Sequence, residues 1–589
     1  MRIAIIILSI YIANIVQCDD TSSGPDDFRT LNSELLKLNE INAILEWESA
    51  TRPSPNVSAL KREFYKMRVG WREGWCDKLR GSREERIVYL LCRGPKFSPE
   101  QASLLSLISD ELMMSYQSRE VCDTSGKCFR GEPELRRLMA TSRDEGVLRW
   151  AWTAWRDGMS PLKSLFMQFI ALENSGARRN GYRDVGDIWR EEMGIANVEV
   201  VMETLWSDVE ELYQLLHAVV RFRLRGGYPG VVDPLSPIPA HLLGDLWGQN
   251  WGALLDVLLP EKSVTLNITE SLRNKNYSVL DMVKRSEDFY VSLGFPRLPK
   301  QFWKHSIFTR GDHGENCHGF AANMNKNGDF RIMGCFEVTE EDFRTIHHEM
   351  GHVYYYMAYE GQDAIFRSGV NSAFHESIGE AVLLGVMTPQ HLQRIGLAGD
   401  AILTHNLAIL LKEALIKLPL IASALIVEKW RFRIFEGNVE STELNDFWWE
   451  LHRDIMGIAP VNPRPDHLFF DPPAKFHIIA NIPYLRYFFA SFLQFQIFDS
   501  MCQSAVTGKI NNVNFTFPLH KCDIYGSKDS TKNLRSVMKM GSSVDLSSAL
   551  QQLSRVPKLR VEPLTRYFKP VYDFLRKEID NFNIPVGWS

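Results

Sequence analysis

The chain has 589 residues, and 45% of them are hydrophobic, so it can bury a large core. The formal net charge is −5 and the pI is about 6.3, and no stretch of sequence forms a basic stripe. A protein with this charge balance is not expected to bind nucleic acid, and we exclude that class of partner.

The N-terminal segment is typical of a secretory signal peptide. It reads "MRIAIIILSIYIANIVQCDD", in which one Arg precedes an apolar run that is too short to span a bilayer and that ends at Cys18 before two acids. We predict a signal peptide over residues 1–18 and a secreted, extracellular mature chain over 19–589. No later stretch reaches about 18 uncharged apolar residues, so we expect no membrane anchor.

Helical periodicity dominates the rest of the chain. The first helix is expected over residues 26–50, where five apolar residues recur at spacings of three or four: Leu31, Leu35, Leu38, Ile41 and Leu45. Further helices are predicted over 58–92, 97–120, 132–175, 198–225, 278–294, 340–385, 400–436, 444–456 and 484–505. A Pro/Gly-rich loop is predicted over 226–241, and a short strand over 329–338.

The chain shows neither an internal repeat nor a low-complexity linker that would separate independent domains. We therefore predict a mainly α fold: one large helical domain over residues 19–589, with a cleft between two halves.

The cysteines agree with export to an oxidising compartment. Of the nine, Cys18 leaves with the signal peptide, and eight remain to form four disulfides. Proximity in sequence suggests the pairs Cys76–Cys92, Cys122–Cys128, Cys317–Cys335 and Cys502–Cys522. Spacing does not determine connectivity, and a cysteine–zinc site is the alternative, although the chain has no C-x-x-C.

Four N-x-S/T sequons are candidate sites for N-linked glycans in a secreted chain: Asn56, Asn267, Asn276 and Asn514. Each sequon could also be unused.

The motif "HHEMGH", residues 347–352, contains H-E-x-x-H within a segment of helical periodicity. On a helix, His348 and His352 point the same way and could bind one metal ion. Glu349 could then reach a water molecule on that ion, which is the arrangement of zinc peptidases. The alternative is two histidines that share a helix face by chance.

A second segment, "FHESIGE", offers a third ligand in Glu376, twenty-four positions after His352. Glu380 follows on the same helix face and could orient a zinc-binding histidine, whereas its alternative is a solvated helix charge. We interpret the neighbouring His347 and His375 as structural.

Several longer motifs resemble the angiotensin-converting enzyme family of zinc peptidyl-dipeptidases. They are "IPAHLLGDLWGQNW", "HHEMGH", "FHESIGEAV", "DPPAKFHI", "IPYLRYF" and "PLHKCDIYGSK". The resemblance runs from about residue 26 to the end, and it implies a single copy of the catalytic unit in a secreted form. It also implies an ellipsoidal, nearly all-α zincin-type fold with a deep central channel and N-terminal lid helices.

The resemblance assigns roles to individual residues. It implies one zinc ion bound by His348, His352 and Glu376, with Glu349 as general base and Tyr487 as the partner of the oxyanion. His318 and His477 would bind the peptide backbone, and Gln249, Lys475 and Tyr484 would bind the C-terminal carboxylate. A Lys ammonium, a Tyr hydroxyl and an amide that converge would suit a free carboxylate.

Some positions depart from the family pattern. Glu380 stands where the family has Asp. Vertebrate members of the family are activated by chloride. Arg156 and Trp448 match the first chloride site, but His452 stands where the family has Arg. Trp189 and Arg486 match the second chloride site, but Met193 stands where the family has Tyr. Chloride binding is therefore an open question for this chain.

We expect a secreted zinc peptidyl-dipeptidase that releases C-terminal dipeptides from small peptides. One alternative is a carboxypeptidase that releases single residues; the family's carboxypeptidase has Arg in the place of Gln249. The other alternative is a catalytically weak homologue that binds peptides, although such proteins typically lose a zinc ligand or the general base. The sequence leaves the physiological peptide and the oligomeric state open.

Overall fold

The computed structural model describes residues 25–259, 266–311, 317–510 and 515–589. Over this part the chain is mainly α, which confirms the predicted fold class. The predicted signal peptide and the sequon at Asn514 lie outside the described residues.

The α-helices cover most of the described chain. Their bounds are α2 (Pro25–Thr51), α3 (Pro55–Lys78), α4 (Glu85–Cys92), α5 (Pro99–Gln117), α6 (Arg136–Thr141), α7 (Glu145–Asp157), α8 (Lys163–Arg179), α9 (Val185–Glu192), α10 (Val198–Gly227), α11 (Leu255–Leu258), α12 (Ile268–Asn274), α13 (Val279–Ser292), α14 (Lys300–His305), α15 (Glu340–Tyr359), α16 (Ser372–Val386), α17 (Pro389–Arg394), α18 (Leu407–Phe435), α19 (Leu444–Leu451), α20 (Phe476–Ile479), α21 (Leu485–Thr507), α22 (Lys532–Met540), α23 (Leu546–Ser554) and α24 (Glu562–Phe582).

The strands in the described chain are short and form two-stranded ladders. β1 (Glu120–Cys122) pairs antiparallel with β2 (Cys128–Arg130), and β4 (Phe320–Asn323) pairs antiparallel with β5 (Phe330–Met333). β3 (Ile238–Pro239) pairs in parallel with β6 (Ile458–Ala459). The predicted strand over 329–338 is therefore confirmed only in its first half, as β5.

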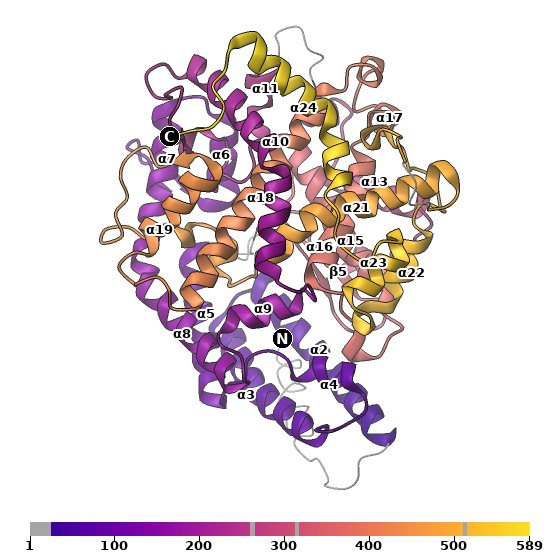
Figure 1. The fold of residues 1–589 in the computed structure, drawn as a ribbon. Helices are drawn as coiled ribbons and strands as arrows, with labels where there is room; N and C mark the ends of the chain where they lie inside the picture. Colours follow the sequence, from indigo (N-terminus) through magenta and orange to yellow (C-terminus); the bar gives the residue numbers. More distant parts are fainter. Residues whose placement is uncertain (1–24, 260–265, 312–316, 511–514) are drawn as a thin grey trace.

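The first helices form the lower part of the molecule in Figure 1, where α2, α3 and α4 are drawn in indigo. The five apolar residues predicted for the first helix are all buried in α2. α2 packs against α3, and near its end Trp47 forms a small apolar cluster with Met324, just after β4, and Met333 of β5. The N-terminal helices are thus joined to the body of the protein by apolar contacts.

The centre of the molecule is built around α18, a helix that is buried on nearly all sides. It packs against α10, α21 and α24, and α21 packs in turn against α16, the neighbour of α15 (Figure 1). A helix that is buried all round belongs to the core of a large protein. Its buried charged residues, Glu413, Lys417, Glu428 and Arg431, must therefore find partners inside the protein.

Several predicted helices are divided in the structure. The segment 58–92 is interrupted by a turn in which Gly81 has a φ of 82°, a left-handed conformation that glycine adopts readily. The segment 340–385 is divided because Asn371 caps a new helix, its Oδ1 accepting a hydrogen bond from the Phe374 N–H at 2.7 Å. The segment 132–175 becomes three helices, α6, α7 and α8.

The end of the chain holds helices that the periodicity analysis does not assign. α22, α23 and α24 lie between residues 532 and 582, and α24 contains Pro570 in its interior. A proline inside a helix disrupts the local pattern, so helix formation here depends on burial of the apolar face against α10, α18 and α21.

All four disulfides suggested by sequence proximity are present in the structure. They join Cys76 to Cys92, Cys122 to Cys128, Cys317 to Cys335 and Cys502 to Cys522. Each closes a short segment, and the first one connects α3 to α4.

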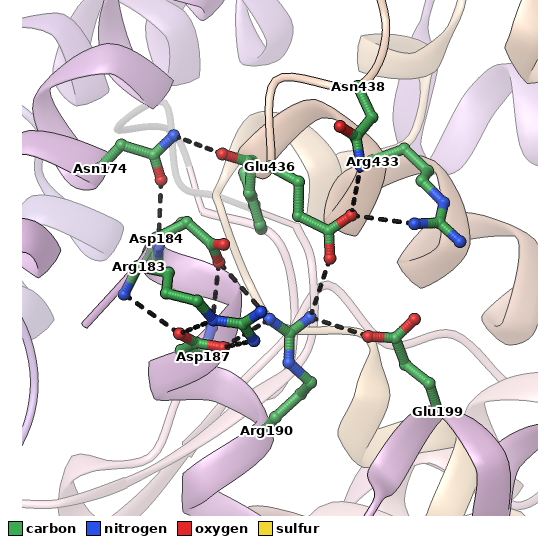
Figure 2. Close-up of polar contacts among 11 residues, drawn as sticks. Asn174, Arg183, Asp184, Asp187, Arg190, Glu199, Arg433, Glu436 and Asn438 are labelled. Carbon is green, nitrogen blue, oxygen red and sulfur yellow. Dashed lines mark hydrogen bonds and ion pairs between the residues drawn. The ribbon is translucent and has the colours of Figure 1, made fainter.

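A charge network fixes α9 against the end of α18. Arg190 lies 2.7 Å from Asp187 of its own helix, 3.1 Å from Glu199 of α10 and 3.9 Å from Glu436 just after α18, as Figure 2 shows. Its guanidinium also covers the ring of Phe432, at 4.6 Å from the ring centroid. Three helices are therefore connected through one side chain.

Among the helices of the described residues, none combines the length and the apolar character that a membrane span requires.

Candidate functional site

The helix α15 carries the H-E-x-x-H motif. Thr339 caps its N-terminus, with its Oγ1 accepting a hydrogen bond from the Asp342 N–H at 3.1 Å. Acidic residues occupy the first turn, where their negative charge interacts favourably with the helix dipole. Phe343, Ile346 and Met350 are fully buried. The apolar side of the predicted helix therefore faces the core.

Two glycines allow α15 and α16 to approach closely. A Cβ on Gly379 would lie 2.3 Å from the carbonyl oxygen of His348, and a Cβ on Gly351 would lie 2.4 Å from the Cα of Gly379. Neither glycine has room for a side chain, because backbone atoms of the facing helix fill the space that a Cβ would take. This approach brings the histidines of α15 next to the carboxylate of Glu376 on α16.

Three ligand atoms converge where the two helices meet. His348 Nε2 and His352 Nε2 lie 3.2 Å apart, and each lies 3.5 Å from Glu376 Oε2. In tetrahedral zinc sites, bond lengths near 2.0–2.1 Å place neighbouring donors about 3.3–3.5 Å apart. The two nitrogens and one oxygen thus match the donors and spacing of a catalytic zinc site.

Glu349 completes this cluster. A carboxylate oxygen of Glu349 and the ligand atoms of His348 and His352 all lie within 4.8 Å of one another, and Glu349 is buried. A carboxylate at this place is within reach of a water molecule beside the three donors, as a general base must be.

Each histidine of this cluster has a polar partner on α16 at its other ring nitrogen. Glu380 Oε1 lies 3.0 Å from His348 Nδ1, and His375 Nδ1 lies 2.7 Å from His352 Nδ1. Burial holds the pKa of His375 well below its ordinary value, so its neutral ring can accept the Nδ1–H of His352. Both arrangements leave the Nε2 lone pairs for a metal ion.

A second cluster brings together Gln249, Lys475 and Tyr484. Gln249 Oε1 accepts hydrogen bonds from the ammonium of Lys475 and from the hydroxyl of Tyr484, the latter at 2.7 Å. Lys475 lies over the ring of Tyr484, at 4.2 Å from its centroid, and over that of Trp247, at 4.5 Å. The structure thus brings all three predicted residues to one place.

Lys475 is 4% exposed, and burial lowers its pKa to about 7, although Asp245 and Glu132 favour its charged form. Gln249 is fixed from its backbone side, because its N–H donates to Asp245 Oδ2 at 2.9 Å. The cluster therefore presents donors in a largely desolvated environment, where hydrogen bonds to an ionised carboxylate are strong.

Buried charges on α18 hold the segment that carries the second cluster. Glu428 Oε1 accepts hydrogen bonds from the backbone N–H groups of Tyr484 and Leu485, at the start of α21. Arg431 donates to the carbonyl oxygens of His477, at 2.9 Å, and Ile482, at 2.7 Å. The loop between α20 and α21 is therefore bound to the core at both ends.

An aromatic group includes His318, His477, Tyr484 and Tyr487. The ring centroid of His477 lies 5.4 Å from that of His318, 5.0 Å from that of Tyr484 and 5.2 Å from that of Tyr487. Burial, assisted by Glu376, raises the pKa of Tyr487 well above its ordinary value, so its hydroxyl stays a proton donor. Burial lowers the pKa of His477 well below its ordinary value, so this ring is neutral.

Arg156 and Trp448, matched to the first chloride site, line one cavity, whereas Arg486 and Trp189, matched to the second, contact different residues. Arg156 is buried and donates to the carbonyl oxygen of Leu246 at 2.9 Å, and it lines a cavity of about 10 Å³ together with Trp448 and His452. Arg486 lies 3.8 Å from Glu376 Oε1, and Trp189 packs edge-on against Phe435.

Two residues at this site, Glu132 and Lys417, are not named among the site residues expected from the sequence, and a third, His375, is interpreted there only as structural. Glu132 Oε2 lies 3.2 Å from His318 Nδ1, His375 contacts His352, and Lys417 of α18 contacts Glu380. His375 is adjacent to Glu376 in sequence, and that proximity is the only local signal for any of the three. The interpretation of His375 as merely structural leaves out its contact with a candidate ligand.

Comparison with known proteins finds relatives that match most of the chain. Residues 83–588 match the model of the family described as angiotensin-converting enzyme. The chain is 38% identical over 480 residues to an angiotensin-converting enzyme from Bos taurus, which covers 80% of this chain and 36% of that protein. It is 36% identical over 480 residues to the enzyme of that name from Oryctolagus cuniculus, with the same coverage of 80% and 36%. With the enzyme from Mesocricetus auratus the identity is 35% over 497 residues, which cover 83% of this chain and 37% of that protein. The matched region thus spans little more than a third of the length of these relatives.

Proposed function

Because this chain belongs to the angiotensin-converting enzyme family, we propose that it is a zinc peptidyl-dipeptidase that releases dipeptides from the C-termini of small peptides. The proposal joins two activities of the site: cleavage at the cluster of His348, His352 and Glu376, and recognition of a free carboxylate at the cluster of Gln249, Lys475 and Tyr484.

The observation that carries the proposal is the convergence of Lys475 and Tyr484 on the side-chain oxygen of Gln249. An ammonium and a phenol that both donate to one acceptor can also donate to a carboxylate oxygen that enters the same place. The Gln249 amide would turn its N–H groups toward that carboxylate. An exopeptidase requires such a site, whereas an enzyme that cleaves inside long chains does not.

The donor set of two imidazoles and one carboxylate suits Zn²⁺, and the three atoms lie at the mutual distances given above. When bound here, zinc would lower the pKa of a water molecule toward about 7 and polarise the carbonyl of the bond to be cut. His348, His352 and Glu376 would hold it, and Arg486 lies near the other oxygen of Glu376, at 3.8 Å.

The remaining groups handle protons and hold the substrate. Glu349 takes a proton from the attacking water on its carboxylate and passes it to the leaving amine. The Tyr487 hydroxyl donates a hydrogen bond to the carbonyl oxygen as negative charge develops on it. His318 and His477 hydrogen-bond the peptide backbone, and Glu132 fixes the ring of His318 through its Nδ1.

We also propose that residues 19–589 form one catalytic domain, which is secreted after removal of residues 1–18. Four disulfides support an oxidising compartment. Asn56, Asn267 and Asn276 are exposed and accessible to glycans. Chloride would bind beside Arg156 and Trp448 or beside Arg486 and Trp189, since guanidinium groups attract anions, and Arg156 is buried.

The test is mass spectrometry of a decapeptide incubated with the purified protein, with and without a chelator and over a series of chloride concentrations. The expected result is loss of two C-terminal residues, abolished by chelation and restored by zinc. Loss of single residues would instead identify a carboxypeptidase. Intact peptide in the presence of bound zinc would identify a peptide-binding homologue, and either outcome would overturn the proposal.

A further inference from the structure

The middle of α18 carries a buried lysine next to the candidate metal centre. Lys417 is 3% exposed, and its ammonium forms an ion pair with Glu380 Oε2 on α16, 37 positions earlier in the chain. A buried ammonium is costly unless it is paired, so this contact is a constraint on both helices. The pair connects the core helix with the helix that supplies Glu376.

Glu380 uses its two oxygens for two different partners. Oε2 contacts Lys417, while Oε1 lies 3.0 Å from His348 Nδ1. The carboxylate therefore forms a bridge between a core cation and a candidate metal ligand. Because a glutamate has one more rotatable bond than an aspartate, it needs a second contact to keep one oxygen at the imidazole.

Rotation of the His348 ring is opposed by this bridge. With its Nδ1 held 3.0 Å from Glu380 Oε1, the ring keeps its Nε2 directed at His352 Nε2 and Glu376 Oε2, which lie 3.2 and 3.5 Å away. A carboxylate that accepts a hydrogen bond from the free N–H of a metal-bound imidazole fixes the tautomer and orientation of the ring and strengthens the metal bond. We infer that Lys417 is a positioning residue of the metal centre, which acts by holding the Glu380 carboxylate against His348.

This inference rests on the zinc site proposed above, and α18 provides a matched control. Lys412, five residues before Lys417, also forms an ion pair with a glutamate, Glu340 Oε2, at 2.7 Å. Glu340 lies at the start of α15, eight positions before His348, and its partners are Lys412 and Arg344. Loss of the Lys412 pair would thus weaken the contact between α18 and α15 without touching a metal ligand or its hydrogen-bond partner.

The experiment measures the zinc dissociation constant of the full-length protein by competition with a chromophoric chelator, independently of peptide cleavage. Lys417→Met is expected to raise this Kd by about tenfold to a hundredfold, and Lys412→Met by less than about twofold. Glu380→Gln should also weaken zinc binding. In that background Lys417→Met should add less than about twofold, because the two residues act through one contact.

The outcomes separate this inference from the proposed function. Tight zinc binding by the unaltered protein together with an unchanged Kd in Lys417→Met would overturn the role of Lys417 alone. The same loss of affinity in the presence and absence of Glu380 would show that Lys417 acts by another route. Failure of the unaltered protein to bind zinc would contradict the proposed function itself. If Lys417→Met fails to fold, the double variant with Glu380→Gln, which removes both charges, is measured instead. Its zinc Kd must match that of Glu380→Gln alone.

Discussion

The metal-binding half and the carboxylate-binding half of the candidate site differ in how the chain assembles them. The candidate metal donors His348, His352 and Glu376 come from α15 and α16, two helices that follow each other in sequence. The carboxylate cluster joins Gln249 to residues 226 and 235 positions away, Lys475 and Tyr484. The first half depends on helix periodicity and one close helix–helix contact, whereas the second depends on the fold of the whole molecule.

The two halves also differ in how their charges are balanced. At the metal half, Glu380 is paired with Lys417, and Glu376 lies 3.8 Å from Arg486. At the other half, no carboxylate of the described residues forms an ion pair with Lys475, whose neighbours are the Gln249 oxygen and two aromatic rings. A substrate carboxylate would supply the missing countercharge, so we expect chemistry and binding to be separable by mutation.

The largest effect is expected from Glu349→Gln, which breaks the metal half. Loss of the general base should lower kcat by about 10²–10⁴-fold, because the neutral amide cannot accept the proton of the attacking water. Zinc content and KM should stay close to those of the unaltered protein, as measured by metal analysis and steady-state kinetics. A variant with nearly normal kcat would contradict the role assigned to Glu349.

A smaller effect is expected from Lys475→Met, which breaks the carboxylate half. Removal of a charge-assisted hydrogen bond should raise KM by about 10- to 100-fold for a peptide with a free C-terminus. The matched control is the same peptide with a C-terminal amide, for which the unaltered protein and the variant should differ by less than about threefold. Equal losses for both peptides would show that Lys475 supports the fold and not carboxylate binding.

The smallest effect is expected in the pH dependence of kcat/KM, which tests the charge of Lys475 in the carboxylate half. Burial lowers the pKa of Lys475 to about 7, so its positive charge is lost as the pH rises through this value. Binding of the carboxylate needs that charge, so kcat/KM for the free-acid peptide should fall a few-fold between about pH 7 and 8. Lys475→Arg keeps its charge at this pH and should lack this decline. A decline of the same size in both proteins would assign it to another group.

The sequence alone determined those features that depend on neighbours along the chain. Helix periodicity places side chains at i and i+4 on one face, which is why the sequence already indicated that His348 and His352 lie together. Proximity along the chain also suggested the four disulfide pairs that the structure contains, each of which joins cysteines no more than 20 positions apart.

Only the tertiary structure decided which distant side chains complete each half of the site. Gln249 and Lys475 could be predicted only from the family resemblance, because no local sequence pattern relates them. Lys417 and Glu132 carried no signal at all, yet they contact Glu380 and His318. The physical reason is that helix packing is directed by the burial of large apolar surfaces, so the partner of a buried charge is set by which helices meet. The order of residues along one helix does not contain that information.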